Sequence, residues 1–431
     1  MGGIPKFKKN KMVINKLKSN KLFRDSFWTL FGNAIGKGLT VLSGILVAKL
    51  LGKDVFGEYG LLKNTLLIIA IFSTMGLGYT STIFVSRYKQ DNENILYSFI
   101  KSLLYITFLF SGIIAFLIFI FSSQIACFLE DSRLSMGLKY LSVIIIFNAL
   151  TTTQIGILAG FKLFKQTAYI NILSGILNFI FSVGLTYIWG FNGALLALLL
   201  SQVINYLLNH LILRKQLSFL NRTNNQKAPL LPILRQSLPI ALQEMSLSIT
   251  HWLGTLLLLR LSNYGEVGLY SAASQWSAVI LFIPIALRNV VLSYLSYKQS
   301  SDQRNKILLT VMSLYVVCTL VPSILIHLFS KTIIQFYGES FIGLSNVLIV
   351  SCYATVFNSI YNIFSSVFMS KNKNWLLYGI TISRDILNLI GLYLLIVLFG
   401  INGAYSMSLS TITTAGITVL ACIFFYRRIH C

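Results

Sequence analysis

Long apolar runs recur through the whole sequence, from Phe27 to Phe425, and many of them extend over twenty or more residues. An α-helix needs a run of that length to cross the hydrocarbon core of a bilayer. The composition agrees, because 55% of the residues are hydrophobic and only 11% are charged, whereas soluble domains carry about 25% charged residues. We therefore predict an all-α polytopic membrane protein.

The apolar runs divide into twelve predicted transmembrane helices when the sequence is cut at charge clusters, prolines and Gly-Asn turns. The first six are expected near 26–50, 58–86, 95–121, 136–160, 168–189 and 192–213. The second six are expected near 237–260, 267–297, 307–329, 344–369, 375–399 and 401–425.

The basic residues set the expected orientation. The net charge is +23, but most Lys and Arg residues lie in short loops on one side of the predicted scheme. The opposite side holds five of them, Lys53, Arg133, Lys139, Arg260 and Lys331. The positive-inside rule then places both termini in the cytoplasm. A nucleic-acid partner is not expected, because the basic residues form no stripe on a soluble face.

The longest polar interruption after the N-terminus separates the two sets of six helices. The predicted organisation is a basic cytoplasmic N-terminal segment (1–25), a first lobe (26–213), a cytoplasmic linker (214–236), a second lobe (237–425) and a cytoplasmic tail (426–431).

Short motifs in the first lobe return in the second at nearly one offset. Gly-Glu-Tyr at 57–59 is echoed by Gly-Leu-Tyr at 268–270, and Tyr-Lys-Gln at 88–90 by the same triplet at 297–299. Gly-Phe-Asn-Gly-Ala at 190–194 is echoed by Gly-Ile-Asn-Gly-Ala at 400–404. The basic loop at 162–165 is matched by 371–373, and Lys49 by Arg260. A shared offset across several motifs indicates a duplication.

The even number of helices in each copy gives both lobes the same orientation. This is the parallel type of transporter repeat, with a pseudo-two-fold axis along the membrane normal and a substrate site between the lobes. The two Gly-x-Asn-Gly-Ala turns leave no room for a loop, so they require residues with positive φ and should make each flanking helix pair a tight hairpin.

Several charged residues fall within the predicted helices, where each costs about 2.5 to 3.5 kcal/mol on insertion scales. The cationic ones are Lys37, Lys63, Arg288 and Arg384. They are candidates for a positive cavity that binds an anionic head group by charge-assisted hydrogen bonds. The structural alternative is that Lys63 reaches toward an interface, and that Arg384 pairs with Asp385 or Glu244 to hold helices together.

Glu244, His251 and Asp385 are candidates for ion coupling or charge pairing. His251 follows Glu244 by two helical turns on one face, which is compatible with a proton relay, although a buried structural histidine is the simpler interpretation. Pro284 and Pro322 predict kinks within their helices.

No enzyme site is expected. The five cysteines are scattered without a CxxC pair, so neither a metal centre nor a disulfide framework is indicated. The segment 32–38 (Gly-Asn-Ala-Ile-Gly-Lys-Gly) lacks the P-loop spacing and the Ser or Thr after its Lys. We predict no catalytic residues, no cofactor and no metal.

Three segments carry a resemblance to a known family. Residues 50–59 (Leu-Leu-Gly-Lys-Asp-Val-Phe-Gly-Glu-Tyr) are similar to a LLG-x-x-x-[FY]-G-x-[YF] pattern after the first helix. Residues 160–165 and the turn at 190–194 are two further matches. With them, almost the whole chain resembles the polysaccharide repeat-unit (O-antigen type) flippases of the multidrug/oligosaccharidyl-lipid/polysaccharide exporter superfamily.

The resemblance implies a MATE-like fold and transport of an undecaprenyl-pyrophosphate-linked oligosaccharide. It also implies a multi-pass protein of the bacterial cytoplasmic (inner) membrane, serving O-antigen, lipopolysaccharide or other surface polysaccharide synthesis. The expected partners are the lipid-linked oligosaccharide, the bilayer and other polysaccharide-assembly membrane proteins. The peptidoglycan-precursor branch typically has fourteen helices, two more than are predicted here.

Two alternatives from other functional classes remain open. A drug exporter of the same superfamily would favour acidic cavity residues, which bind cations, and the acidic candidates here are few, namely Glu244 and Asp385. A membrane polymerase or ligase of lipid-linked glycans would usually need a large outside loop, whereas the longest outside segments expected here are 122–135 and 330–343.

Overall fold

The structure, a computed structural model of the chain, describes residues 6–74, 77–91, 93–128, 134–220, 230–285, 301–371 and 373–430. For 6–30, 221–244 and 286–307, no side chain is described. Every regular element in the described part of the chain is helical, which confirms the all-α prediction. Eight helices among these residues are long and apolar enough to cross a membrane.

The first half of the chain contains α1 to α6. Their bounds are α1 Lys6–Thr74, α2 Leu77–Asp91, α3 Glu93–Ile120, α4 Ser122–Phe128, α5 Leu134–Gly160 and α6 Phe164–Leu217. The second half contains α7 Leu230–Leu261, α8 Tyr264–Ile280, α10 Ser301–Leu328, α11 Ser330–Tyr337, a 3-10 turn η1 Glu339–Phe341, α12 Leu344–Ser370, α13 Asn374–Val397 and α14 Gly403–His430. In both halves a short helix, α4 or α11, connects two long ones.

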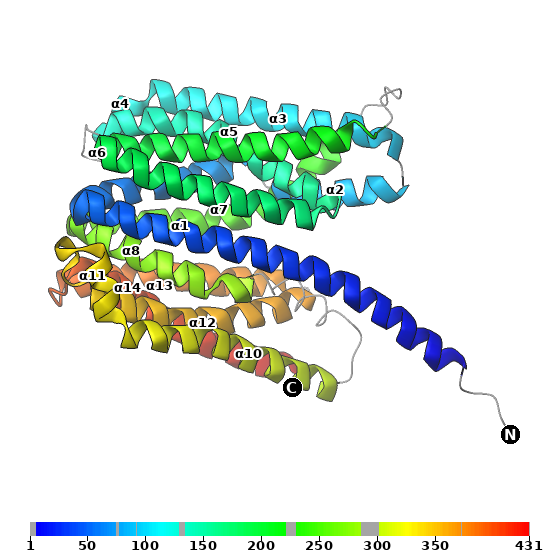
Figure 1. Ribbon diagram of the computed structural model, residues 1–431. Coiled ribbons are helices and arrows are strands. Elements are labelled where there is room, and N and C mark those ends of the chain that lie inside the picture. The colour runs from blue at the N-terminus through cyan, green and yellow to red at the C-terminus, as the bar shows by residue number, and fades with distance from the viewer. Residues whose placement is uncertain are drawn as a thin grey trace.

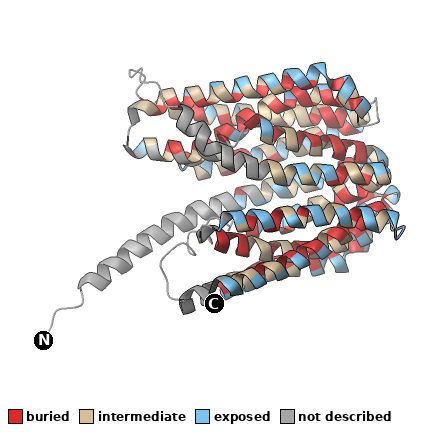
Figure 2. Ribbon diagram, turned by 180° about the vertical axis from the view of Figure 1, so that it is seen from behind, coloured by how far each residue is buried: buried red, intermediate tan, exposed pale blue. Residues whose placement is uncertain are grey.

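The helices run along one common direction in two groups (Figure 1). Helices α3 to α6 form one group and α10 to α14 the other, with α1, α7 and α8 between them. Large apolar side chains such as Tyr105, Phe116 and Ile188 are exposed on the outer surfaces, where pale blue residues line the outward faces of the helices (Figure 2). An apolar exterior is what hydrocarbon solvates, so this surface fits a bilayer.

Two long helices are each folded at a single glycine. Helix α1 changes direction at Gly52 (φ 75°) and α6 at Gly190 (φ 53°). Glycine adopts these positive φ values without the steric cost that a Cβ atom brings. Gly400, which precedes α14, has φ 62°. The predicted positive-φ turns at the two Gly-x-Asn-Gly-Ala segments are therefore confirmed.

Hydrogen bonds across the Gly190 turn show that α6 is a hairpin. Ser201 donates to Asn178 Oδ1 at 2.7 Å, and Ser174 donates to Asn205 Oδ1 at 3.4 Å. In both pairs the two residues lie almost equally far from Gly190 along the chain. The two arms of α6 are therefore antiparallel neighbours.

Several helix boundaries differ from those predicted. The expected loop between 50 and 58 lies inside α1, because one glycine suffices to turn the chain. The described residues of the expected helix 58–86 belong to α1, which ends at Thr74, and to α2, which begins at Leu77. Helix α7 begins at Leu230 instead of 237, with Pro232 in its first turn, where proline is tolerated.

The expected helix 267–297 is interrupted before Pro284. Helix α8 ends at Ile280, four residues before Pro284, and residues 282–285 are helical again. A proline ring clashes with the carbonyl group of the residue four positions earlier, so the regular helix is broken there. The carbonyl oxygen of Pro284 accepts a hydrogen bond from the Tyr315 hydroxyl at 3.0 Å.

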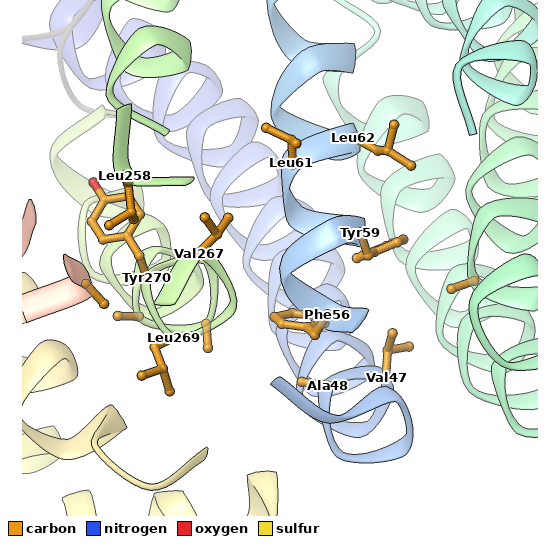
Figure 3. Close-up of a cluster of buried hydrophobic side chains, with 14 of the residues drawn as sticks. Val47, Ala48, Phe56, Tyr59, Leu61, Leu62, Leu258, Val267, Leu269 and Tyr270 are labelled. Atoms are coloured by element: carbon orange, nitrogen blue, oxygen red, sulfur yellow. The ribbon is translucent and has the colours of Figure 1, made fainter. Parts of the chain in front are cut away.

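Repeat-related residues meet where the second arm of α1 contacts α8. A Cβ atom added to Gly57 would lie against the Tyr264 carbonyl oxygen, and one added to Gly268 against the Lys53 carbonyl oxygen. The two contacts exchange under an offset of 211, which is the property of an isologous interface around a two-fold axis. Figure 3 shows these two helices side by side, with Phe56 and Tyr59 on α1 and Val267 and Tyr270 on α8.

A second equivalent pair fixes the direction of the axis. Gly60 lies against Ser271, again 211 positions apart, with 3.0 Å between an added Cβ and the Ser271 Cβ. Equivalent residues can meet at successive turns only if the two helices run in parallel along the axis. The contact pattern therefore fits the parallel repeat, with the axis along the helices.

Candidate functional site

A polar cavity of about 300 Å³ lies among the helices of the first half, bounded at one point by α8 of the second half. Its lining is Gly36, Lys37, Thr40, Ser43, Gly44, Val47, Tyr59, Lys63, Asn171, Ser174, Gly175, Asn178, Ser182, Leu198, Ser201, Gln202, Asn205 and Gln275. Most of these side chains carry an amide, a hydroxyl or an ammonium group. Such a lining is unlike that of a typical apolar ligand pocket.

The two lysines of the cavity come from the two arms of α1, which the turn at Gly52 brings side by side. Lys37 is exposed and its Nζ lies 4.9 Å from the centre of the Phe282 ring, so this cation contacts the second half of the chain. Lys63 is partly buried on the other arm. No acidic residue is among the lining side chains. The cavity therefore has a positive electrostatic character, which favours an anionic ligand.

The amides of α6 are held in place by hydrogen bonds between its two arms. Asn178 Oδ1 accepts from Ser182 at 3.1 Å as well as from Ser201. Asn209 Nδ2 donates to Asn205 Oδ1 at 3.0 Å. Because their oxygens are used in this network, the amide N–H groups of Asn178 and Asn205 are the donors that remain for a ligand.

The second half of the chain closes part of the cavity. Gln275 on α8 packs so tightly on Gly44 that a Cβ atom there would meet Gln275 Oε1. Next to the cavity, Trp252 Nε1 on α7 donates to Thr65 Oγ1 at 3.1 Å. The cavity therefore borders the interface between the two halves, and movement of one half against the other would change its shape.

The predicted cations do not all meet in this cavity. Lys37 and Lys63 line it, whereas Arg384 is on α13 and is not among its lining residues. Arg384 donates from Nε and Nη2 to Asp385 Oδ1, at 2.9 and 2.8 Å, and its guanidinium lies 5.0 Å from the Tyr361 ring centre. The charge pairing considered for Arg384 and Asp385 is therefore observed.

The other predicted site residues have different positions. His251 on α7 is exposed and interacts electrostatically with Asp385, so these two candidates lie close together. The side chain of Glu244 and the whole of Arg288 lie outside the described residues.

The amide and hydroxyl residues of α6 were missed as site candidates, although the sequence contains a signal for them. Asn171, Ser174, Asn178 and Ser182 follow one another at intervals of three or four residues in an otherwise apolar helix. That spacing puts them on one face. A polar face on a membrane helix normally lies toward the protein interior or a water-filled space, as it does here.

The fold matches solved membrane transporters. A multidrug resistance MATE family transporter of the MOP superfamily, in an inward-facing conformation, superposes with a TM-score of 0.74 at 17% identity, covering 91% of this chain and 94% of that one. The outward-facing form gives a TM-score of 0.66 at 18% identity, covering 94% and 95%.

The lipid II flippase MurJ, in an inward closed conformation, gives a TM-score of 0.73 at 17% identity, covering 94% of this chain and 87% of that one. No curated protein sequence matches the chain. These relatives by fold are transporters and a flippase rather than enzymes.

A family model described as "Polysaccharide biosynthesis protein" matches residues 22–296. That match covers more than half of the chain, including all of α2 to α8 and every residue of the cavity lining. It agrees with the resemblance carried by residues 50–59, 160–165 and 190–194, and with the MOP-superfamily fold. The chain belongs to the polysaccharide biosynthesis protein family.

Proposed function

We propose that the protein is a flippase that moves an undecaprenyl-pyrophosphate-linked oligosaccharide across the bacterial cytoplasmic membrane for surface polysaccharide synthesis. The observation that carries this proposal is the cavity described above, which combines Lys37 and Lys63 with many neutral hydrogen-bonding groups and no acidic lining residue. Ammonium groups bind phosphate oxygens, and amides and hydroxyls bind sugar hydroxyls. The same lining would repel a cationic drug.

The size of the cavity indicates which part of the substrate it would hold. Its volume of about 300 Å³ is at the lower end of ligand sites, which extend over roughly 300–1,000 Å³. We therefore assign to it the phosphate groups and the adjoining sugar. The polyprenyl chain would remain in the surrounding lipid, against the apolar outer faces of the helices.

The proposed transport cycle is a rocking of lobe 26–213 against lobe 237–425, with both termini in the cytoplasm. Three features support a cytoplasm-facing state here. The backbones of the two lobes are in contact near Gly52, at the end of the molecule that the charge pattern places outside. The TM-score is higher with the inward-facing transporter than with the outward-facing form, and the flippase match is to an inward closed conformation. Alternating access at a repeat interface fits such a motion.

We propose separate roles for the charged residues that do not line the cavity. Arg288 and Arg384 would add positive charge along the path of the head group. Glu244, His251 and Asp385 would act in ion coupling or in charge pairing.

The test compares single-charge losses in a strain that lacks the chromosomal copy of the protein. Lys63→Met and Lys37→Met should each reduce surface polysaccharide and cause the lipid-linked intermediate to accumulate. A lost charge-assisted hydrogen bond costs about 1.5 to 3 kcal/mol, a change of roughly ten- to a hundredfold in affinity. Lys139→Met is the matched control, because Lys139 is exposed on α5 outside the cavity.

Membrane abundance of each variant is measured by immunoblot, and intermediate and polymer are quantified in the same cultures. Wild-type polysaccharide from both Lys63→Met and Lys37→Met at equal abundance would refute the assignment of the cavity. Normal polysaccharide with loss of resistance to cationic drugs would instead indicate a drug exporter.

A further inference from the structure

The second half of the chain contains a counterpart of the cavity face of α6. Ser174, Gly175 and Asn178 precede Gly190 by the same intervals as Arg384, Asp385 and Asn388 precede Gly400. The asparagine is shared, but a neutral Ser-Gly pair has been replaced by an ion pair. Tyr59 of the cavity likewise corresponds to Tyr270, which lies near His251 with 6.4 Å between ring centres.

The Arg384–Asp385 ion pair is incomplete on both sides. Both arginine donors go to the same carboxylate oxygen, Oδ1. Asp385 Oδ2 is buried and has no hydrogen-bond partner among the described residues. A guanidinium has five N–H donors and is best matched by an anion that presents two oxygens to it. Asp385 presents one, so it satisfies Arg384 poorly.

The pair also joins no two helices, because Arg384 and Asp385 are neighbours on α13. Adjacent residues of a helix do not face each other, so the contact requires the arginine to bend back along its own helix. Arg384 is instead positioned by α12, where its guanidinium lies over Tyr361 and the Tyr361 hydroxyl lies 2.6 Å from Thr381 Oγ1. The carboxylate therefore neutralises Arg384 without fixing its place.

From this geometry we infer that Arg384, supported by Tyr361, is a second anion-binding site whose resident ligand is the Asp385 carboxylate. An incoming phosphate group would displace Asp385 from the guanidinium and present two oxygens where the carboxylate presents one. This inference rests on the proposed function and adds to it an occupied counter-site in the second lobe. The resident carboxylate keeps the arginine neutralised in lipid while no substrate is bound.

The experiment uses the purified full-length protein in lipid nanodiscs, with inorganic pyrophosphate as the probe and calorimetric titration as the readout. Asp385→Asn keeps a carbonyl oxygen at the position of Oδ1 but removes the competing charge. It should bind pyrophosphate about tenfold more tightly than wild type, since a charge-assisted hydrogen bond becomes available to the probe. Glu339→Gln removes one negative charge elsewhere and is the matched control.

Two more variants assign the gain to Arg384. Asp385→Asn combined with Arg384→Gln should lose the gain, and Asp385→Asn combined with Arg384→Lys should keep only part of it, because an ammonium cannot reproduce the planar fork. Each preparation is checked for a monodisperse elution profile. Affinity in Asp385→Asn no higher than in wild type, or a gain that persists without Arg384, would overturn the inference.

The result is separable from the proposed function. Lys63→Met and Lys37→Met test the first-lobe cavity, and wild-type pyrophosphate affinity together with normal polysaccharide in both variants would refute the proposed function. The tighter binding of Asp385→Asn would still be measured on the second lobe. If Lys63→Met reduces surface polysaccharide as expected and Asp385→Asn shows no gain in pyrophosphate affinity, the flippase proposal stands and the second site is refuted.

Discussion

Asn64 on α1 donates a hydrogen bond to the Thr255 hydroxyl on α7 at 3.3 Å, across the interface between the two halves of the chain. With the repeat offset of 211, Gln275 corresponds to Asn64 and Gly44 to Thr255, and Gln275 and Gly44 are also in contact. Of these two equivalent contacts, the first is a hydrogen bond beside the cavity, and the second is the Gln275 amide packed on Gly44 within the cavity wall. The duplicated interface is therefore symmetric in its backbone and asymmetric in its chemistry.

Because the backbones of the two lobes are in close contact at Gly57, we predict that a side chain added at this position would keep the lobes apart. Gly57→Ala places a Cβ atom against the Tyr264 carbonyl oxygen, so it should disfavour the state in which this end is closed. A single cysteine at position 271, otherwise buried in the contact with Gly60, should then react faster with a membrane-impermeant thiol reagent in a cysteine-free background. Gly112→Ala, which meets nothing within 4 Å, is the control. Unchanged protection in Gly57→Ala would contradict the prediction.

A cross-link between repeat-related residues should stop the cycle. Cysteines at 60 and 271 would have Cβ atoms about 3.0 Å apart, and a disulfide needs roughly 3.5 to 4.5 Å, a small adjustment. We expect oxidation to abolish polysaccharide export and reduction to restore it, because the lobes must separate here for the site to open outward. Each single cysteine serves as its control. Full export by the oxidised double variant would show that this contact stays closed during transport.

The positive-φ turn of α6 predicts a stability difference between two glycines of that helix. Gly190→Ala forces a Cβ atom into a backbone conformation with φ 53° and ψ −130°, which L-residues rarely adopt, at a strain of roughly 1–3 kcal/mol. Gly184 has open space around it, so Gly184→Ala should be neutral or mildly stabilising through helix propensity. Thermal unfolding followed by size-exclusion fluorescence should give a lower midpoint for Gly190→Ala alone. Equal midpoints would show that the turn tolerates a side chain.

The charge distribution predicts the topology. Reporter fusions after residue 54 and after residue 224 should lie on opposite sides of the membrane, with 224 and both termini in the cytoplasm. Alkaline phosphatase and green fluorescent protein report the two compartments. Activity of the same reporter at both positions would overturn the predicted orientation.

The sequence was most informative where local chemistry decides the structure. The turns at Gly190 and Gly400 were predicted because a turn without a loop leaves few residue types possible. A helix end near residue 50 was also predicted, but with a loop up to residue 58, because an apolar run does not show that a single glycine can join two helices. Helix propensity and lipid solvation favour the same residues on both sides of such a turn.

The site was predictable in its charge but not in its arrangement. Lys37 and Lys63 were recognised because an intramembrane cation is costly, yet their meeting depends on the fold of α1 at Gly52. The partner of Arg384 could not be chosen between Asp385 and Glu244, since pairing depends on how a long side chain bends. The asparagines of α6 were passed over because a neutral amide in a helix carries no charge signal.

The one-residue turns at Gly190 and Gly400 also restrict how the chain enters the bilayer during synthesis. The two arms of α6 have no polar loop between them that would let the first arm settle in lipid before the second arrives. They must insert as a closed hairpin, in which Ser201 and Asn178 already satisfy each other and need not face hydrocarbon alone. The polar face that later lines the cavity is thus shielded from lipid during biogenesis by the partner that the turn supplies.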